Sequence, residues 1–364
     1  MNQRETRSVL IFGGAGFIGS NLACHLLTRT DARVHLFDNL SRAGVHHNLK
    51  WLSKLAPQPE RLRITIGDVR ELNLVEEAVA EANEIYHFAA QVAVTTSIAD
   101  PRLDFEVNLG GTFNVLDAAR RCGHHPLIFF TSTNKVYGDL GLGKPVITSS
   151  SYFYPQFSGV SETQPLDFHS PYGCSKGAAD QYVRDFARIY DLPTVVFRMS
   201  CIAGARQFGT EDQGWVAHFL YSALRKKPVV IYGDGRQVRD VLCVQDLIRA
   251  FEAVRQAPGP KGQLYNVGGG MQNTVSLREL IEEITDLTGI RLEHVRRERR
   301  PGDQPVYITD YSKIQRDTGW KPEISVRDTL RLLQRFWQEN REVLTLRDSA
   351  ETFAVATELS GRAG

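Results

Sequence analysis

The chain has 364 residues, of which 42% are hydrophobic and 23% are charged, the proportions of an ordinary folded globular protein. Its 43 basic and 42 acidic side chains leave a net charge of +1, so we expect neither nucleic acid nor a membrane surface as a partner. The sequence offers no signal peptide, no long apolar run and no metal-type pair among its 5 cysteines, which predicts a cytoplasmic protein with reduced thiols and no metal site.

Short apolar runs alternate with amphipathic stretches over the first two-thirds of the chain. The runs are rich in β-branched and aromatic residues, which is typical of strands buried on both faces of a sheet. They are residues 9–12, 34–37, 62–66, 85–88, 127–130 and 194–197. Helical patterns such as 19–28 and 112–121 lie between them. This alternation predicts an α/β protein with a doubly wound parallel sheet of the Rossmann type.

The regular alternation ends near residue 198. Beyond it the loops lengthen, glycine and proline cluster, and a helical pattern over 277–288 stands apart. We therefore predict a first domain over 1–198 and a smaller C-terminal substrate-binding lobe over 199–346, with the chain crossing back between the two. The small and polar stretch 347–364 is expected to be a mobile tail.

A glycine-rich turn follows the first predicted strand and opens a helix. Gly13, Gly16 and Gly19 recur there at a three-residue spacing, with Phe17 and Ile18 between the last two. Such a turn brings bare backbone close to a pyrophosphate, and the helix N-terminus offers free N–H groups to phosphate oxygens. The turn predicts a dinucleotide site, whereas an ordinary glycine-rich turn is the alternative.

An acidic residue follows the second predicted strand. Asp38 lies at the distance of about 20 residues where a carboxylate accepts hydrogen bonds from ribose hydroxyls and repels a 2′-phosphate. That position favours NAD over NADP, although Arg42 is close enough to accommodate the extra phosphate. Asn39 and Ser41 lie between the two and are predicted to line the same site.

The ends of later strands supply further candidate cofactor contacts. A carboxylate after the third strand is placed to accept a hydrogen bond from an adenine amino group, or else caps a turn. Small residues at the end of the fourth strand leave room for a cofactor over the sheet edge. These predicted contacts are Asp68, Val69, Ala89, Ala90, Gln91 and Asn108.

Tyr172 and Lys176 stand four residues apart at the start of a predicted helix, so they share one face. A free phenol has a pKa of about 10. A nearby ammonium and a positively charged cofactor ring lower that value, which would make Tyr172 a base for a substrate hydroxyl. Thr133, at the end of the fifth strand, is predicted to hydrogen-bond the reacting oxygen, with Ser132 as its rival.

Together these motifs resemble the extended short-chain dehydrogenase/reductase family, which contains epimerases and dehydratases of nucleotide sugars. The resemblance covers about residues 8–340, and the stretches 132–139, 167–182 and 204–215 resemble the CDP-hexose 2-epimerases of that family most closely. It implies tightly held NAD, transient oxidation at C2 of a CDP-linked hexose and return of the hydride to the opposite face. It also implies a homodimer or homotetramer.

Asn134 and Lys135 occupy the two positions after Thr133 where the family's dehydratases carry an Asp-Glu pair. Elimination of water needs an acid and a base, and neither of these side chains replaces two carboxylates. The pair therefore argues against a dehydratase, and more weakly against a UDP-sugar 4-epimerase, which remains the chief alternative. A net oxidoreductase and a non-catalytic NAD-binding protein are the others. Lys135 is left without a chemical role.

The second lobe carries arginines that the resemblance assigns to the substrate diphosphate. A guanidinium matches phosphate oxygens and stays charged, so Arg239 and Arg300 are predicted to hold it. His169 either lines the sugar pocket or is structural. The full set of predicted substrate contacts is Thr133, Asn134, His169, Ser200, Arg206, Gln207, Gln213, Arg239, Arg300 and Asp303.

Overall fold

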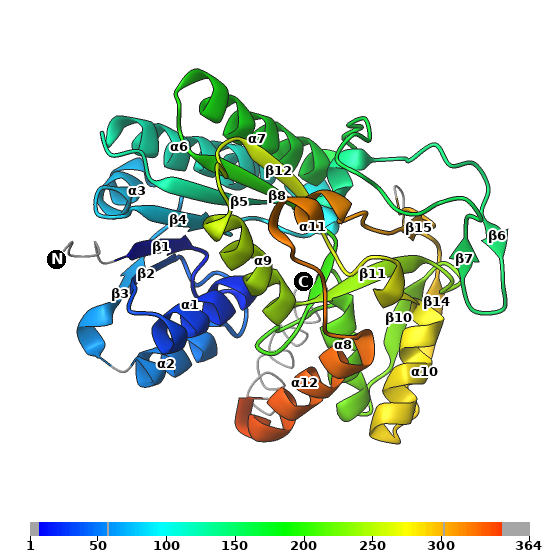
Figure 1. The fold of residues 1–364 in the computed structure, drawn as a ribbon. Coiled ribbons are helices and arrows are strands. Elements are labelled where there is room, and N and C mark those ends of the chain that lie inside the picture. The colour runs from blue at the N-terminus through cyan, green and yellow to red at the C-terminus, as the bar shows by residue number, and fades with distance from the viewer. Residues whose placement is uncertain (1–6, 57, 301–302, 344–364) are drawn as a thin grey trace, which may run out of the picture.

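A seven-stranded sheet forms the centre of the computed structural model, which describes residues 7–56, 58–300 and 303–343 (Figure 1). The strand order is β12-β8-β5-β4-β1-β2-β3, and all neighbouring strands run parallel. This confirms the predicted Rossmann-type sheet. The strands are β1 (Ser8–Phe12), β2 (Arg33–Asp38), β3 (Leu62–Ile66), β4 (Glu84–His87), β5 (Leu127–Thr133), β8 (Thr194–Met199) and β12 (Gln263–Val267).

Helices cover both faces of this sheet, because successive side chains of a strand point to opposite faces. Val9 and Ile11 belong to the core shared with α1 and α9, whereas Leu10 and Phe12 belong to the core shared with α3, α6 and α7. The first group of helices is α1 (Phe17–Arg29), α2 (Val45–Leu55), α9 (Val244–Gln256) and α11 (Ser312–Thr318). The second group is α3 (Leu72–Val79), α6 (Gly111–Arg121) and α7 (Ser170–Ile189).

The prediction that every strand is buried on both faces is wrong for β3. Ile64 and Ile66 are 38% and 55% exposed. β3 is an edge strand whose two isoleucines join neither apolar core of the sheet, whereas the other edge strand, β12, contributes Leu264, Tyr265 and Val267 to these cores. Burial therefore holds for the inner strands and for β12.

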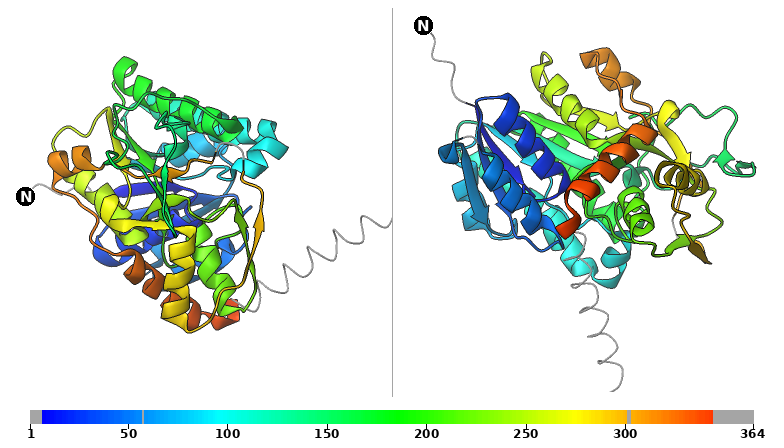
Figure 2. Two further views of the ribbon diagram at one scale, coloured as in Figure 1. Left: turned by 90° about the vertical axis from the view of Figure 1, so that its right-hand side faces the viewer. Right: turned by 90° about the horizontal axis from the view of Figure 1, so that it is seen from below.

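A smaller lobe packs beside the carboxyl ends of the strands (Figures 1 and 2). Its strands are β9 (Cys201–Ala203), β10 (Val229–Tyr232), β11 (Val238–Cys243), β13 (Thr274–Ser276), β14 (His294–Arg297) and β15 (Val306–Tyr307). Three helices, α8 (Trp215–Leu224), α10 (Leu277–Thr288) and α12 (Val326–Glu339), share one apolar core with it. A capping box of Ser276 and Glu279 fixes the start of α10.

The chain passes between the two layers more than once. It leaves the sheet after β8, returns with α9 and β12, and then enters the lobe again with β13 and α10. The predicted boundary at residue 198 thus marks the first crossing, because the later segment also supplies the edge strand β12. The predicted tail 347–364 lies outside the described residues.

Short elements connect the strand ends. These are η1 (Pro59–Arg61), α4 (Val94–Ala99), α5 (Pro101–Phe105), the π-helical turn η2 (Glu106–Gly110), η3 (Asn134–Tyr137), the hairpin strands β6 (Val146–Ile147) and β7 (Tyr152–Phe153), and η4 (Met271–Asn273). All five cysteines are free. In the ranges that the structure describes, no helix has both the length and the apolar character of a membrane span.

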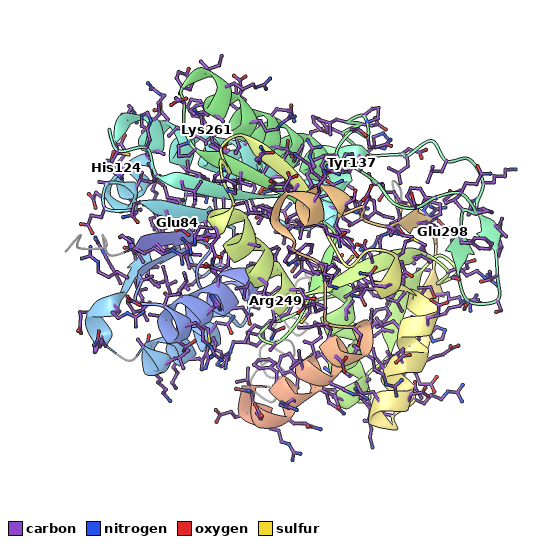
Figure 3. The ribbon with its side chains drawn as sticks, viewed as in Figure 1. Glu84, His124, Tyr137, Arg249, Lys261 and Glu298 are labelled. Atoms are coloured by element: carbon purple, nitrogen blue, oxygen red, sulfur yellow. The ribbon has the colours of Figure 1, made fainter. Side chains whose placement is uncertain are left out.

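A buried ion pair ties α7 to the sheet. Arg198 on β8 donates to both carboxylate oxygens of Asp180 on α7, at 2.8 and 2.9 Å. Arg198 also donates to the hydroxyl of Tyr137, which is labelled in Figure 3, at 3.1 Å, and Tyr137 donates to Asn266 on β12 at 2.7 Å. Breaking a buried pair leaves an uncompensated charge, so this network fixes where α7 lies over β5 and β8.

Candidate functional site

The glycine-rich turn lies between β1 and α1 with its backbone bare. Gly13 has a φ of +77°, and a Cβ there would come within 2.8 Å of the Ala89 nitrogen after β4. A Cβ on Gly19 would overlap the carbonyl oxygen of Gly13. A Cβ on Gly16, the residue before α1, would meet only that oxygen, at 3.1 Å. The start of α1 thus presents open backbone of the kind that a pyrophosphate needs.

Asp38 closes β2 beside this turn. Its carboxylate accepts hydrogen bonds from the backbone nitrogens of Ala15, at 3.0 Å, and Leu40, at 2.8 Å. Burial raises the pKa of Asp38, and these backbone donors act in the opposite sense. Each carboxylate oxygen retains acceptor capacity. Asp38 is therefore fixed against the glycine turn with room to accept from ribose hydroxyls.

Four further predicted cofactor residues follow the ends of β2 and β3. Asn39 donates to Asp68 at 2.8 Å, and the hydrogen bonds from Arg70 lower the pKa of Asp68 to about 2. Asp68 is thus a charged acceptor. Ser41 donates its backbone N–H to Asn39 at 3.1 Å. Val69 differs from the others, because its side chain belongs to the hydrophobic core.

Phe17 and Ile18 are the first residues of α1 and pack against the core on its face of the sheet. Ala89 and Ala90 follow β4, and the Ala89 backbone abuts the glycine turn. Arg42 donates to Gln213 of the second lobe at 2.8 Å. It therefore joins the cofactor side of the site to the substrate side.

Tyr172 and Lys176 lie in the first turns of α7 and are both buried. Burial raises the pKa of Tyr172 to about 12, while a hydrogen bond with Thr133 acts to lower it. Burial lowers the pKa of Lys176 to about 7, and its ammonium lies 4.2 Å from the centre of the Phe130 ring. The three predicted catalytic side chains thus meet where β5 ends and α7 begins.

The expected lowering of the Tyr172 pKa is not found in the protein itself. Burial penalises the charged form of both groups, so it opposes the phenolate and the ammonium together. Sequence spacing places the two side chains but carries no information about their desolvation. A phenolate at this position requires positive charge beyond that of Lys176.

The two residues after Thr133 face different partners. Asn134 is buried, and its side-chain oxygen lies 3.4 Å from the Thr133 hydroxyl. The Lys135 ammonium lies 3.9 Å from the Asp303 carboxylate, to which Arg239 donates at 2.6 Å. Burial acts to raise the pKa of Asp303, but Arg239, Lys135 and Arg299 hold it below its ordinary value. Lys135 therefore belongs with Arg239 at the junction of the two layers.

The other predicted substrate residues are more dispersed. Arg300 donates to Asp212 at 3.0 Å and lies 3.9 Å over the Tyr232 ring. His169 lies 2.9 Å from Asp167 and is half exposed. Arg300 also accepts a hydrogen bond from the Asp303 nitrogen through its backbone carbonyl, at 3.3 Å, whereas His169 directly precedes α7.

Three predicted substrate residues are engaged in the fold. Arg206 lies 3.4 Å over the Trp51 ring of α2, and burial lowers its pKa to about 10. Gln207 donates to the carbonyl of Ile202 at 3.1 Å, and Ser200 donates to Asp240. These contacts give each of the three a packing or hydrogen-bonding role within the protein, which the sequence did not indicate.

The sequence did not single out one buried hydroxyl on α4, and it ranked another, on β5, second. Among the described residues, the hydroxyls of Thr95 on α4 and Ser132 on β5 have no hydrogen-bond partner. On the same helix α4, Ser97 accepts a hydrogen bond from the backbone nitrogen of Tyr172 at 3.2 Å. The signal in the sequence is the hydroxyl-rich run that follows the fourth strand, residues 95–97.

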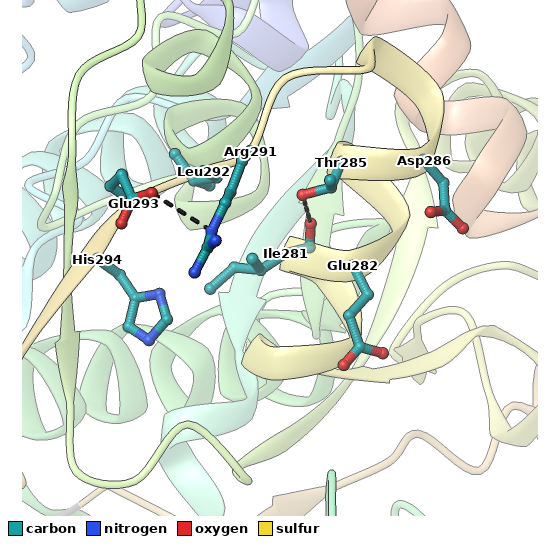
Figure 4. A pocket seen from close by; sticks show the side chains of 8 residues that line it. All are labelled: Ile281, Glu282, Thr285, Asp286, Arg291, Leu292, Glu293 and His294. Carbon is teal, nitrogen blue, oxygen red and sulfur yellow. Dashed lines mark hydrogen bonds and ion pairs between the residues drawn. The ribbon is translucent and has the colours of Figure 1, made fainter.

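A surface hollow of about 340 Å³ lies elsewhere, between α10 and β14 (Figure 4). It contains none of the predicted site residues. Its lining is Ile281, Glu282, Thr285, Asp286, Arg291, Leu292, Glu293 and His294. The candidate site therefore remains the edge of the sheet and its junction with the lobe.

Comparisons with known proteins cover nearly the whole chain. A model of the GDP-mannose 4,6-dehydratase family matches residues 10–333. CDP-paratose 2-epimerase of Salmonella typhi is 44% identical over 88% of this chain and 96% of that protein. A dTDP-glucose 4,6-dehydratase of Neisseria meningitidis is 33% identical over 92% of this chain and 94% of that protein. The structure of Thermus thermophilus UDP-glucose 4-epimerase with NAD superposes with a TM-score of 0.77 at 30% identity, covering 92% of this chain and 99% of that one.

Proposed function

The chain belongs to the GDP-mannose 4,6-dehydratase family of NAD-dependent epimerases and dehydratases, and from that premise we propose that it inverts C2 of CDP-paratose or a related CDP-hexose. The reaction would pass through a transient 2-keto sugar. The 44% identity with a CDP-paratose 2-epimerase supports this substrate. The alternative within the family is inversion at C4 of a UDP-sugar, the activity named for the Thermus thermophilus enzyme.

The observation that carries the proposal is the pair after Thr133. Asn134 holds its amide against the Thr133 hydroxyl, and Lys135 turns its ammonium toward Asp303. Neither supplies a carboxylic acid at the reacting carbons, which elimination of water requires. The site thus retains the means to oxidise and reduce a sugar while lacking the acid pair of a dehydratase.

NAD is the cofactor that the residues fit. Gly13, Gly16 and Gly19 leave the space for a pyrophosphate, and Asp38 would accept from the ribose hydroxyls. When bound, NAD supplies hydride uptake and return, which no side chain performs. The carboxylate of Asp38 disfavours a 2′-phosphate, and Arg42 is already bonded to Gln213.

Side chains of this protein would accept and return the proton of the sugar hydroxyl. Tyr172 takes the proton of the sugar hydroxyl, and Thr133, which is bonded to it, holds the same oxygen. Lys176 favours the phenolate through its positive charge. Arg239 and Arg300 hold the diphosphate, so that the sugar can turn over without leaving the site.

The chain is also proposed to form a homodimer or homotetramer. Phe113 on α6 and Tyr182 and Ile189 on α7 are 42%, 44% and 66% exposed, and the rings of Phe113 and Tyr182 lie 5.9 Å apart. An apolar face of this kind on two adjacent helices supports self-association. Light scattering on the purified protein tests it, and a monomer at micromolar concentration would exclude it.

A substrate panel tests the proposed activity. The purified protein would be incubated separately with CDP-paratose, CDP-glucose, UDP-glucose, GDP-mannose and dTDP-glucose, and product stereochemistry read by NMR. We expect inversion at C2 of a CDP-sugar with no accumulation of NADH. Inversion at C4 of UDP-glucose would establish the alternative, and loss of water from dTDP-glucose would overturn the argument from Asn134 and Lys135.

A further inference from the structure

A fully buried carboxylate lies behind the catalytic turn of α7. Asp104 on α5 has no exposed surface. One of its oxygens accepts hydrogen bonds from the side-chain nitrogens of Gln91, at 2.7 Å, and Asn108, at 3.1 Å. The other accepts from the hydroxyl of Ser175, at 2.5 Å. Ser175 directly precedes Lys176, so Asp104 is bonded to the segment that carries the catalytic pair.

The orientation of both amides is fixed from the backbone. The side-chain oxygen of Gln91 accepts from the Ala93 nitrogen at 2.6 Å, and that of Asn108 accepts from the Gln91 nitrogen at 2.9 Å. Each amide must therefore turn its NH₂ group toward Asp104. A side chain that receives three donors is suited to the ionised, acceptor-only form of a carboxyl group. Asp104 is thus held as an anion.

Asp104 differs from the other acid that faces Lys176. Asp180, on the same helix as Lys176, is bonded through both oxygens to Arg198. Among the described residues, no Lys, Arg or His lies within ion-pair distance of Asp104. Its charge is therefore balanced at longer range, and Lys176 is the cation that it faces.

The other groups around Tyr172 and Lys176 carry no negative charge near pH 7. His87 on β4 is buried, and burial lowers its pKa to about 3, so it is neutral near pH 7. Tyr172 is faced by Thr133, which is uncharged, and by Asp104. Phe130 offers Lys176 only the face of its ring. Asp104 is the uncompensated charge that both members of the pair share.

We propose that Asp104 is a positioning residue for the proposed epimerase: an anion fixed by Gln91, Asn108 and Ser175 that keeps Lys176 an ammonium and sets the first turns of α7. The role of Asp104 in catalysis rests on the proposed function, whereas its effect on the charge of Lys176 does not depend on the substrate. A negative charge at this position raises the pKa of Lys176 and that of Tyr172 alike. Removing it should lower both.

The direct test is an NMR titration of the substrate-free protein labelled with ¹³C at the lysine ε-carbons, with the Lys176 signal assigned by Lys176→Met. In the unsubstituted protein we expect a midpoint of about 7 for Lys176. In Asp104→Asn the midpoint should fall by about one unit. Asp104→Ser serves in its place if the amide of Asn cannot be accommodated among three donors.

The matched control is Asp185→Asn, which removes a carboxylate from the outer face of α7, where its side chain is 54% exposed. The Lys176 midpoint should stay unchanged in this variant and return in Asp104→Glu. An unchanged midpoint in a folded Asp104→Asn protein would overturn the proposal. Because no substrate is present, that failure is separate from any failure of the proposed activity.

Turnover provides the second readout. With whichever substrate the panel identifies, both limbs of the pH profile of kcat should move to lower pH in Asp104→Asn, because the two pKa values fall together. A purely structural role would lower kcat at every pH and leave the limbs in place. That result would also contradict the proposal.

Discussion

The cofactor side and the substrate side of the candidate site are held in place by different kinds of contact. On the cofactor side, Gly13, Asp38 and Tyr172 lie at the ends of strands or the start of a helix, and each is fixed by backbone contacts. On the substrate side, Arg239 donates to the carboxylate of Asp303, and Arg300 donates to that of Asp212. A ligand must compete with those carboxylates. The first side is therefore preformed, whereas the second must exchange partners to bind an anion.

The largest effect should come from removing the phenol. Tyr172→Phe deletes the group that we propose takes the substrate proton, so kcat should fall by about 10³-fold while NAD stays bound. Kinetics with the substrate identified by the panel, together with the NAD content of the purified variant, would measure this. A variant that loses NAD as well would show that Tyr172 also supports the preformed side, and an unchanged kcat would remove Tyr172 from the mechanism.

The second-largest effect should come from crowding the glycine turn on the preformed cofactor side. Gly13→Ala adds a Cβ 2.8 Å from the Ala89 nitrogen at a φ of +77°. We expect a loss of roughly 1–3 kcal/mol in the free energy of unfolding and weaker NAD binding, measured by chemical denaturation and calorimetry.

Gly123→Ala is the matched control, because Gly123 has a φ of +83° but nothing within 4 Å of an added Cβ. It carries the backbone strain without the crowding. Equal losses of stability and NAD affinity in the two variants would show that crowding of the turn is irrelevant.

The substrate side should respond in KM more than in kcat. Arg239→Met removes the charged donor that we propose binds the diphosphate, an interaction worth about 1.5–3 kcal/mol, so KM should rise about 10–100-fold. Arg236→Met, two residues before β11 and paired with Asp234 at 2.7 Å, is the control and should leave KM nearly unchanged. A fall in kcat without a change in KM would place Arg239 with the reacting atoms.

The smallest effect concerns pH and stability. The pKa of Lys176 is lowered on folding from 10.5 to about 7, so the unfolded chain binds more protons between these values. The free energy of unfolding should therefore rise with pH across this range, with Lys176 contributing up to about 2 kcal/mol between pH 7 and 9. Denaturation of the protein and of Lys176→Met at several pH values measures the difference in slope, and equal slopes would contradict it.

Local spacing explains why so much of the preformed side was predictable. The strand, glycine turn, helix and Asp38 follow one another directly, and Tyr172 and Lys176 share a turn, so short stretches of sequence define them. The edge strand β12 was not predicted, because it pairs with β8 across the intervening residues 200–262, most of which belong to the smaller lobe.

Burial and tertiary contacts account for the rest. Asp104 reads in the sequence as an ordinary acid of a short helix, and only its burial among three donors sets it apart. The stacking of Arg206 on Trp51 joins segments that are distant in the chain. The pKa values of Tyr172 and Lys176 likewise depend on desolvation, which spacing does not encode.

We propose above all that the protein epimerises a nucleotide sugar by oxidation and reduction at C2. Incubation of CDP-paratose carrying deuterium at C2, with the product examined by NMR, tests this most directly. We expect inverted product that keeps the deuterium on C2. Deuterium released to the solvent would show that the carbon is deprotonated instead, and inversion at another carbon with C2 untouched would contradict the assignment of the reacting position.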